Sequence, residues 1–205
     1  MVASGLNVRA HTTEEFTKAV DSLESSLSVF LAEEVDAILL AGITMATQLG
    51  FKAEAEIIAG LEKKVGLPIN SAMRINALAL DHLKAKKVVV ATAYRDAINE
   101  SLKPYFKDAG LDVIGMKGLN VATPVEQDKL PEYSSYRTAL ELVREFPQAD
   151  AVLVHGRWAS VAYIEELERD TGRPVVSSNA ASLWWVLKTL GMKIPIEGYG
   201  TLLRD

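Results

Sequence analysis

The sequence predicts an α/β protein of two pseudo-symmetric lobes, each a mostly parallel sheet flanked by helices. Short apolar runs alternate with helical segments along the chain, which is the pattern of parallel sheets wrapped by helices. The run at 151–154 is continuously apolar, as expected for a strand covered on both faces. The sequence segment around this run occurs twice in similar form, which indicates a duplication.

The duplicated segment is EVDAILLAGITMA at residues 34–46 and QADAVLVHGRWAS at residues 148–160. The same interval separates Asp36 from Asp150 and Gly42 from Gly156. Other segments recur in the same order: GLNV at 5–8 and 118–121, and VGLPINS at 65–71 with TGRPVVS at 171–177. Two similar halves predict a site between them that takes one strand-end turn from each.

In the first half, hydroxyl caps and early acids predict that a helix opens at Thr12 and runs to about Glu33. Gly66 is the expected helix stop before a short strand. The expected elements are a strand at 1–9, that helix, a strand at 36–41, a turn at 42–47, a helix to 64, a strand at 67–69 and a helix at 71–83.

The second half repeats this alternation and ends in a tail, 194–205, that we expect to be an ordered cap. Expected strands are 86–91, 111–116, 151–154 and 174–177; expected helices are 96–109, 124–146 with a break near Pro131, 160–171 and 180–190. We assign residues 1–85 and 181–205 to the first lobe and 86–180 to the second.

The two halves differ at their starts. The second half has a strand and a helix, 86–109, before its GLNV segment, whereas the first begins only a few residues before its own. If the halves are alike, one strand and one helix, about 30 residues, are absent from the amino end. We therefore expect the sequence to be a fragment or to have a misassigned start.

Composition and net charge exclude several classes of protein. The 205 residues are 49% hydrophobic and 24% charged, as in a globular domain. A net charge of −5 without a basic stripe argues against nucleic-acid binding. No apolar run approaches the ~18 residues of a membrane span, and no signal peptide is visible. We therefore expect a cytoplasmic protein without membrane attachment, and homo-oligomer formation stays open.

The chain carries no cysteine, so disulfides and thiol chemistry are excluded within it. Its three histidines, His11, His82 and His155, have no metal-ligand spacing. Neither a P-loop nor a GxGxxG motif is present. We therefore expect neither a metal nor a cofactor.

Several stretches together resemble the aspartate/glutamate racemase superfamily, and within it the arylmalonate decarboxylases, with maleate cis-trans isomerases as near relatives. The stretches are ASGL at 3–6, LAGIT at 40–44, ATAY at 91–94 with Asn99-Glu100, PVVSS at 174–178 and GYG at 198–200. The resemblance implies a two-lobed fold without cofactor. It also implies a carboxylate substrate and an additional strand with a pocket loop at the amino end.

Racemases and isomerases of this superfamily use two cysteines, one from each half. The decarboxylase keeps the second, which protonates a planar enediolate after carbon dioxide leaves, while hydroxyls and backbone N–H groups hold the remaining carboxylate. By resemblance, Gly42 matches the decarboxylase's glycine, and the hydroxyl positions fall on Ile43, Thr44 and Tyr94, of which Ile43 has no hydroxyl. The cysteine position falls on His155 or Gly156, depending on a one-residue gap.

The turn after 151–154 offers its own chemistry. His155 could replace the thiol as proton donor, since an ordinary pKa near ~6.5 suits such work; alternatively it hydrogen-bonds to backbone. Gly156 lets backbone N–H groups approach an anion. Arg157 could clamp a carboxylate or be a solvated charge. Trp158 could line a pocket but is more often simply packed.

The opposing turn, with Gly42, Ile43 and Thr44, has N–H groups at a helix start that suit a carboxylate, although an ordinary helix cap fits equally. Tyr94 could donate a hydrogen bond to the same carboxylate or be half-buried core. Ser177 is a further substrate-binding candidate, with a helix cap or supporting role as its alternative, and Ser178 and Asn179 are expected to be caps or supports as well.

These residues predict a decarboxylase- or isomerase-type enzyme that acts on a small arylmalonate- or maleate-like carboxylate through an enediolate-type intermediate. The proton would come from His155 or from water. A carboxylate-binding protein without turnover is the alternative. A hydrolytic or lyase chemistry that never needed a thiol stays open as a third, without a residue set that names it.

Overall fold

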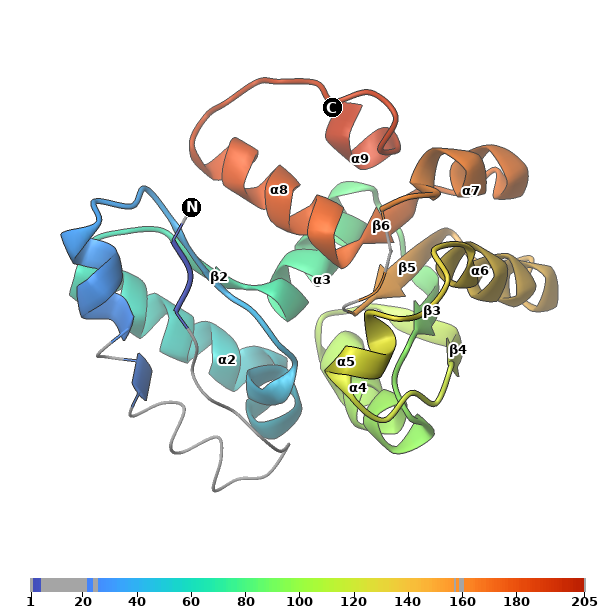
Figure 1. The fold of residues 1–205 in the computed structure, drawn as a ribbon, viewed down its shortest axis with the longest axis horizontal. Coiled ribbons are helices and arrows are strands. Elements are labelled where there is room, and N and C mark those ends of the chain that lie inside the picture. The colour runs from blue at the N-terminus through green and yellow to red at the C-terminus, as the bar shows by residue number, and fades with distance from the viewer. Residues whose placement is uncertain (1, 5–21, 24–25, 157, 159–160, 205) are drawn as a thin grey trace. The chain divides into compact units, whose positions relative to one another are not determined.

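The computed structural model describes residues 2–4, 22–23, 26–156, 158 and 161–204. The expected strand at 1–9 and much of the helix at 12–33 lie largely outside the described residues; residues 22–23 and 26–32 are helical as predicted. The chain divides into two compact units, residues 1–73 and 74–205. Figure 1 labels the elements of each.

The first unit holds a two-stranded parallel sheet. Its elements are β1 (Ile38–Leu40), α2 (Thr44–Val65) and β2 (Ile69–Ser71), and α3 (Ala72–His82) begins at its end. A cluster of buried apolar side chains forms the core: Leu23, Leu27, Ile38, Leu40, Ile58 and Ile69. α2 bends at Gly50, whose φ of 76° and ψ of 170° break the helical ladder. The sequence pattern predicted an unbroken helix there.

The second unit holds a four-stranded parallel sheet in the order β4-β3-β5-β6. The strands are β3 (Lys87–Thr92), β4 (Asp112–Gly118), β5 (Ala151–His155) and β6 (Val175–Ser177). The helices are α4 (Asp96–Asp108), α5 (Pro124–Gln127), α6 (Tyr133–Glu145), α7 (Ile164–Thr171), α8 (Ser178–Thr189) and α9 (Thr201–Arg204). α6 packs across β3, β4 and β5, while α4 packs on β4 and α8 on β5 and β6.

The strand order reverses at the middle of this sheet. The chain passes from β3 to its neighbour β4, and then returns past β3 to form β5 on the other side. Open α/β sheets bind ligands at such a switch point, outside the carboxyl ends of the strands. Here those ends are Thr92 and His155, which are register partners. Gly156 follows His155 directly, and Tyr94 lies two residues after Thr92.

The predicted duplication is visible in the strand pairing. β1 pairs with β2 so that Ile38 faces Ile69 and Leu40 faces Ser71. β5 pairs with β6 in the same register, so that Val152 faces Val175 and Val154 faces Ser177. The turn glycines also agree, with φ of 107° at Gly42 and 118° at Gly156. Each half therefore repeats one strand–turn–helix–strand design.

The second unit differs from the predicted lobes at its borders. Residues 74–85 and 181–205, which we assigned to the first lobe, group with the second unit. The physical reason is that α8 packs on β5 and β6, and the chain loops back from α8 into α9, which packs on α8 and β6 (Figure 1). The predicted break near Pro131 separates α5 from α6. No described helix combines the length and apolar character that crossing a membrane requires.

Candidate functional site

Tyr94, His155 and Gly156 meet at the switch point of the second sheet. The rings of Tyr94 and His155 lie edge to face, with centroids 5.6 Å apart. A Cβ placed on Gly156 would lie 3.2 Å from the Tyr94 hydroxyl oxygen. The structure therefore brings three of the predicted site residues together. Their role toward a substrate stays a prediction.

His155 is buried at the end of β5, with 3% of its surface exposed. Burial away from water lowers the pKa of its imidazole to about 4. The sequence-based expectation of an ordinary pKa near ~6.5 is therefore wrong for the folded protein. At neutral pH the ring is uncharged, so it holds no readily transferable proton.

Two polar residues contact His155: Asn76, which no sequence pattern indicated, and Ser178, for which the sequence indicated a helix cap or supporting role. Ser178 Oγ lies 2.8 Å from His155 Nδ1, and Asn76 Nδ2 lies 3.1 Å from the same nitrogen. Asn76 Nδ2 also donates to Ser178 Oγ over 3.2 Å. Asn76 is fully buried. The backbone hydrogen bond that we considered for His155 is thus replaced by a side-chain cluster from α3, β5 and α8.

The loop that carries Tyr94 is held by a buried hydroxyl. Thr92 Oγ1 accepts from the Tyr94 N–H over 3.1 Å and donates to Asn99 Oδ1 over 2.7 Å. The end of β4 lies directly against this loop, because a Cβ at Gly118 would collide with the Tyr94 carbonyl oxygen. Burial raises the pKa of the Tyr94 hydroxyl to about 12, so it keeps its proton at neutral pH.

Ser177 and Trp158 have structural surroundings. Ser177 Oγ accepts from the Ala180 N–H over 3.1 Å and so caps α8, the supporting role that we considered. Trp158 is 5% exposed, which agrees with simple packing. Its buried Nε1 has no hydrogen-bond partner among the described residues. Arg157 lies outside the described residues.

The turn at residues 42–44 belongs to the first unit. Gly42 has a φ of 107°, and Ile43 is the N-cap residue of α2 without a side-chain cap bond. Ile43 is 5% exposed, so its side chain is buried. Thr44 is the first residue of α2. The approach of Gly42, Ile43 and Thr44 to His155 stays a prediction.

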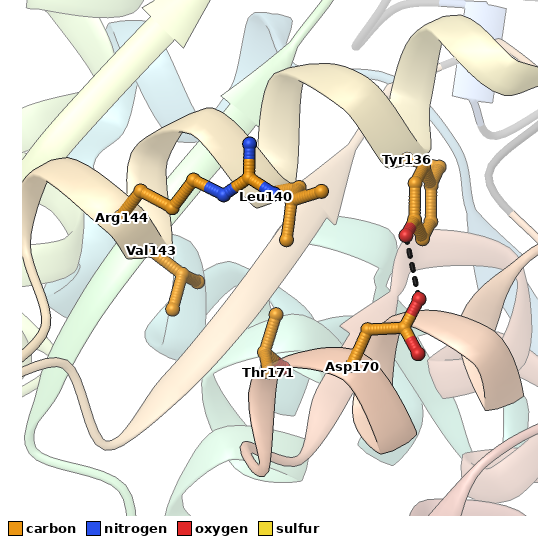
Figure 2. A pocket seen from close by; sticks show the side chains of 6 residues that line it. All are labelled: Tyr136, Leu140, Val143, Arg144, Asp170 and Thr171. Carbon is orange, nitrogen blue, oxygen red and sulfur yellow. Dashed lines mark hydrogen bonds between the residues drawn. The ribbon is translucent and has the colours of Figure 1, made fainter.

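A surface hollow of about 420 Å³ lies elsewhere in the second unit, between α6 and α7. Figure 2 shows its lining, in which the Tyr136 hydroxyl donates to Asp170 over 2.6 Å. None of the predicted site residues lines it. Within the described part of the chain, no group of three His, Asp or Glu side chains could hold a metal ion.

One family model matches nearly the whole chain. The model of the family "Arylmalonate decarboxylase" matches residues 1–203 of the chain. The chain belongs to the arylmalonate decarboxylase family. The arylmalonate decarboxylase of Bordetella bronchiseptica is 24% identical over 206 residues, covering 100% of this chain and 86% of the relative.

Other relatives fall in the same superfamily. The maleate isomerase of Nocardia farcinica is 26% identical over 125 residues, covering 60% of this chain and 49% of the relative. The structure of unliganded arylmalonate decarboxylase superposes with a TM-score of 0.90 at 24% identity, covering 100% of this chain and 88% of that one. The Nocardia farcinica maleate cis-trans isomerase with a bound succinylcysteine intermediate gives 0.85 at 20% identity, covering 94% and 81%. These structures share the fold of this arylmalonate decarboxylase family member.

Proposed function

We propose that this chain is a cofactor-independent decarboxylase or isomerase that acts on a small arylmalonate- or maleate-like carboxylate. The observation that carries the proposal is the placement of Tyr94, His155 and Gly156 at the switch point of the four-stranded sheet. The family match over residues 1–203 and the names of the relatives supply the substrate class.

The site would work by holding negative charge as it develops. In a malonate, the bond between the α-carbon and one carboxyl carbon breaks, and carbon dioxide leaves. The bonding electrons stay on the substrate as an enediolate. The Tyr94 hydroxyl keeps its proton at neutral pH and can donate to an enediolate oxygen. Backbone N–H groups of the Gly156 turn would complete the cradle. Each such donor is worth ~3–4 kcal/mol.

The α-carbon must then take up a proton, and no thiol is available in the 205 residues. His155 is uncharged at neutral pH, since its pKa is about 4. Its N–H would be a far weaker acid than an imidazolium. We therefore favour a water molecule as the proton source, with His155 as a contact to the substrate.

The alternative is a protein of the same fold that binds carboxylates without turnover. The lack of any cysteine favours this alternative, because the relatives' proton donor has no thiol counterpart here. A binder would need the same donors at the switch point but no route for a proton to reach the α-carbon.

A paired experiment separates the two functions. Thermal unfolding is followed with phenylmalonate, maleate and acetate, and the same samples are examined for phenylacetate or fumarate by proton NMR. An enzyme gives product in proportion to protein, and Tyr94→Phe slows it. Stabilisation by dicarboxylates without product at any pH identifies a binder. If no carboxylate stabilises the protein and no product forms, both proposals fail.

A further inference from the structure

His155 carries an unusual hydrogen-bonding pattern on its two ring nitrogens. Nδ1 lies within 2.8 Å of Ser178 Oγ and 3.1 Å of Asn76 Nδ2. Nε2 is fully buried and has no partner among the described residues. Buried polar groups in folded proteins are nearly always paired, so an unpaired one calls for an explanation.

The contact with Asn76 decides where the ring proton sits. An amide nitrogen has two hydrogens and no lone pair to offer, so Asn76 Nδ2 can only donate. In this orientation of the amide, which leaves Asn76 Oδ1 without a partner among the described residues, Nδ1 faces the donor at 3.1 Å and is the nitrogen without a proton. Asn76 also donates to Ser178 Oγ, so the Ser178 hydroxyl can donate to Nδ1 over 2.8 Å, and the two donors share the single lone pair of that nitrogen.

We propose that Asn76 and Ser178 hold His155 as the neutral tautomer protonated at Nε2, so that the ring offers a fixed N–H donor to a substrate carboxylate. The inference rests on the proposed function for its ligand and goes beyond it in two respects. It makes Asn76 and Ser178 positioning residues. It also gives His155 the part of an anion donor, in place of the proton donor that the sequence suggested.

Burial explains why such a device works. An N–H group inside the protein attracts an anion more strongly than the same group in water. Before a ligand binds, a neutral ring can stay buried without the free-energy cost of a buried charge. Burial keeps the pKa of His155 at about 4, so the neutral form is the one present at neutral pH. Binding a carboxylate at Nε2 would then give the unpaired donor its partner.

Nitrogen-15 NMR of the imidazole tests the tautomer directly. The protein is made as His11→Gln/His82→Gln, so that His155 is the single labelled histidine. Without ligand at pH 7, we expect a pyrrole-like Nε2 and a pyridine-like Nδ1. A proton on Nδ1, or a ring that is an imidazolium at pH 7, overturns the inference, whatever the activity is.

The positioning role is tested by Asn76→Asp, which keeps the shape but replaces the donor with an acceptor. The new carboxylate should draw the proton to Nδ1 and raise the pKa of His155. The dissociation constant for succinate, a dicarboxylate without a reactive bond, should rise about tenfold or more. Asn120→Asp is the matched control, because that side chain bonds to the Asp96 N–H and not to the histidine cluster.

The outcomes separate this inference from the proposed function. Product formation from phenylmalonate together with a proton on Nδ1 leaves the function standing and removes the inference. A pyrrole-like Nε2 whose resonance does not respond to succinate removes the carboxylate-donor role. If Asn76→Asp does not fold, Ser178→Ala takes its place and should reduce the fraction protonated at Nε2; an unchanged fraction overturns the role of Ser178.

Discussion

The rings of Tyr94 and His155 meet edge to face at 66°, one following β3 and the other ending β5. Burial acts on the two groups in opposite directions. It raises the pKa of Tyr94 to about 12 and lowers that of His155 to about 4, because each charged form is disfavoured away from water. Both side chains are therefore uncharged at neutral pH, and both can donate to an anion.

Tyr94→Phe removes the hydroxyl and keeps the ring that packs on His155. Under the proposed function the variant should lose about 10²–10³-fold in kcat, the usual effect of removing one oxyanion donor. Its thermal unfolding should change little, since the edge-to-face contact remains. Steady-state kinetics with phenylmalonate measure the effect.

The matched control is Tyr136→Phe. That hydroxyl bonds to Asp170 at the hollow between α6 and α7, and no predicted site residue lies there. It should leave kcat within a factor of about two, because the energy of one exposed hydrogen bond is small. Equal losses in both variants would argue against a catalytic role for Tyr94.

Buried His155 should make the protein acid-sensitive. The unfolded chain binds a proton at this imidazole near its ordinary pKa of about 6.5, whereas the folded chain binds it only near 4. Between these values the unfolded state binds more protons, so acid favours unfolding. The contribution is fully present above pH ~6.5 and lost as the pH falls toward ~4, and it amounts to about 3 kcal/mol.

Urea unfolding at pH 7.0 and pH 4.5 measures this effect. His155→Gln cannot titrate, so its free energy of unfolding should fall less between the two pH values than that of the wild type. His82→Gln alters an exposed histidine and should keep the wild-type difference. If the free energy of unfolding of His155→Gln falls as steeply between the two pH values as that of the wild type, the burial argument is refuted.

Gly156 occupies a backbone conformation that disfavours any side chain. Its φ is 118°, and an added Cβ would crowd the Tyr94 hydroxyl. Gly156→Ala should therefore cost about 1–3 kcal/mol of stability. Gly156→Cys faces the same penalty, so a thiol restored at 155 should be tolerated better by the backbone than one restored at 156.

Gly60→Ala is the matched control for that series. Gly60 lies inside α2, and an added Cβ would meet nothing within 4 Å. Alanine should stabilise it by about 0.5–1 kcal/mol, since it lowers the entropy of the unfolded chain. Urea unfolding of both variants gives the comparison. If Gly156→Ala is as stable as the wild type, the backbone at residue 156 does not strain a side chain as argued.

The sequence predicted the duplication, the strand order along the chain and the two turn glycines, because these depend on local patterns. It indicated a cap or supporting role for Ser178 but not the contact of Ser178 and Asn76 with His155, since that contact joins α3, α8 and β5 across long stretches of chain. The lowered pKa of His155 was missed for the same reason: burial is a property of packing. The bend at Gly50 gave only one signal, a glycine inside a helical pattern.

One side-chain device is repeated in both halves and is extended only in the second. Glu62 Oε1 accepts from the Ile69 N–H over 2.9 Å, and Glu168 Oε1 accepts from the Val175 N–H over 2.9 Å. Each glutamate thus ties the end of a helix to the following strand. Glu168 Oε2 additionally accepts from the N–H and the hydroxyl of Thr201, both over 2.9 Å, and so anchors α9.

Replacing Glu62 and Glu168 separately by glutamine distinguishes the helix-to-strand bond, which both make, from the anchoring of α9, which Glu168 makes in addition. Glutamine keeps one acceptor oxygen, so Glu62→Gln should cost at most about 0.5 kcal/mol, whereas Glu168→Gln loses charged acceptor bonds to Thr201 and should cost about 2 kcal/mol. Hydrogen exchange should show residues 201–204 exchanging faster in Glu168→Gln alone. Equal losses of stability, or unchanged exchange at 201–204, would mean that packing on α8 and β6 holds α9 without Glu168.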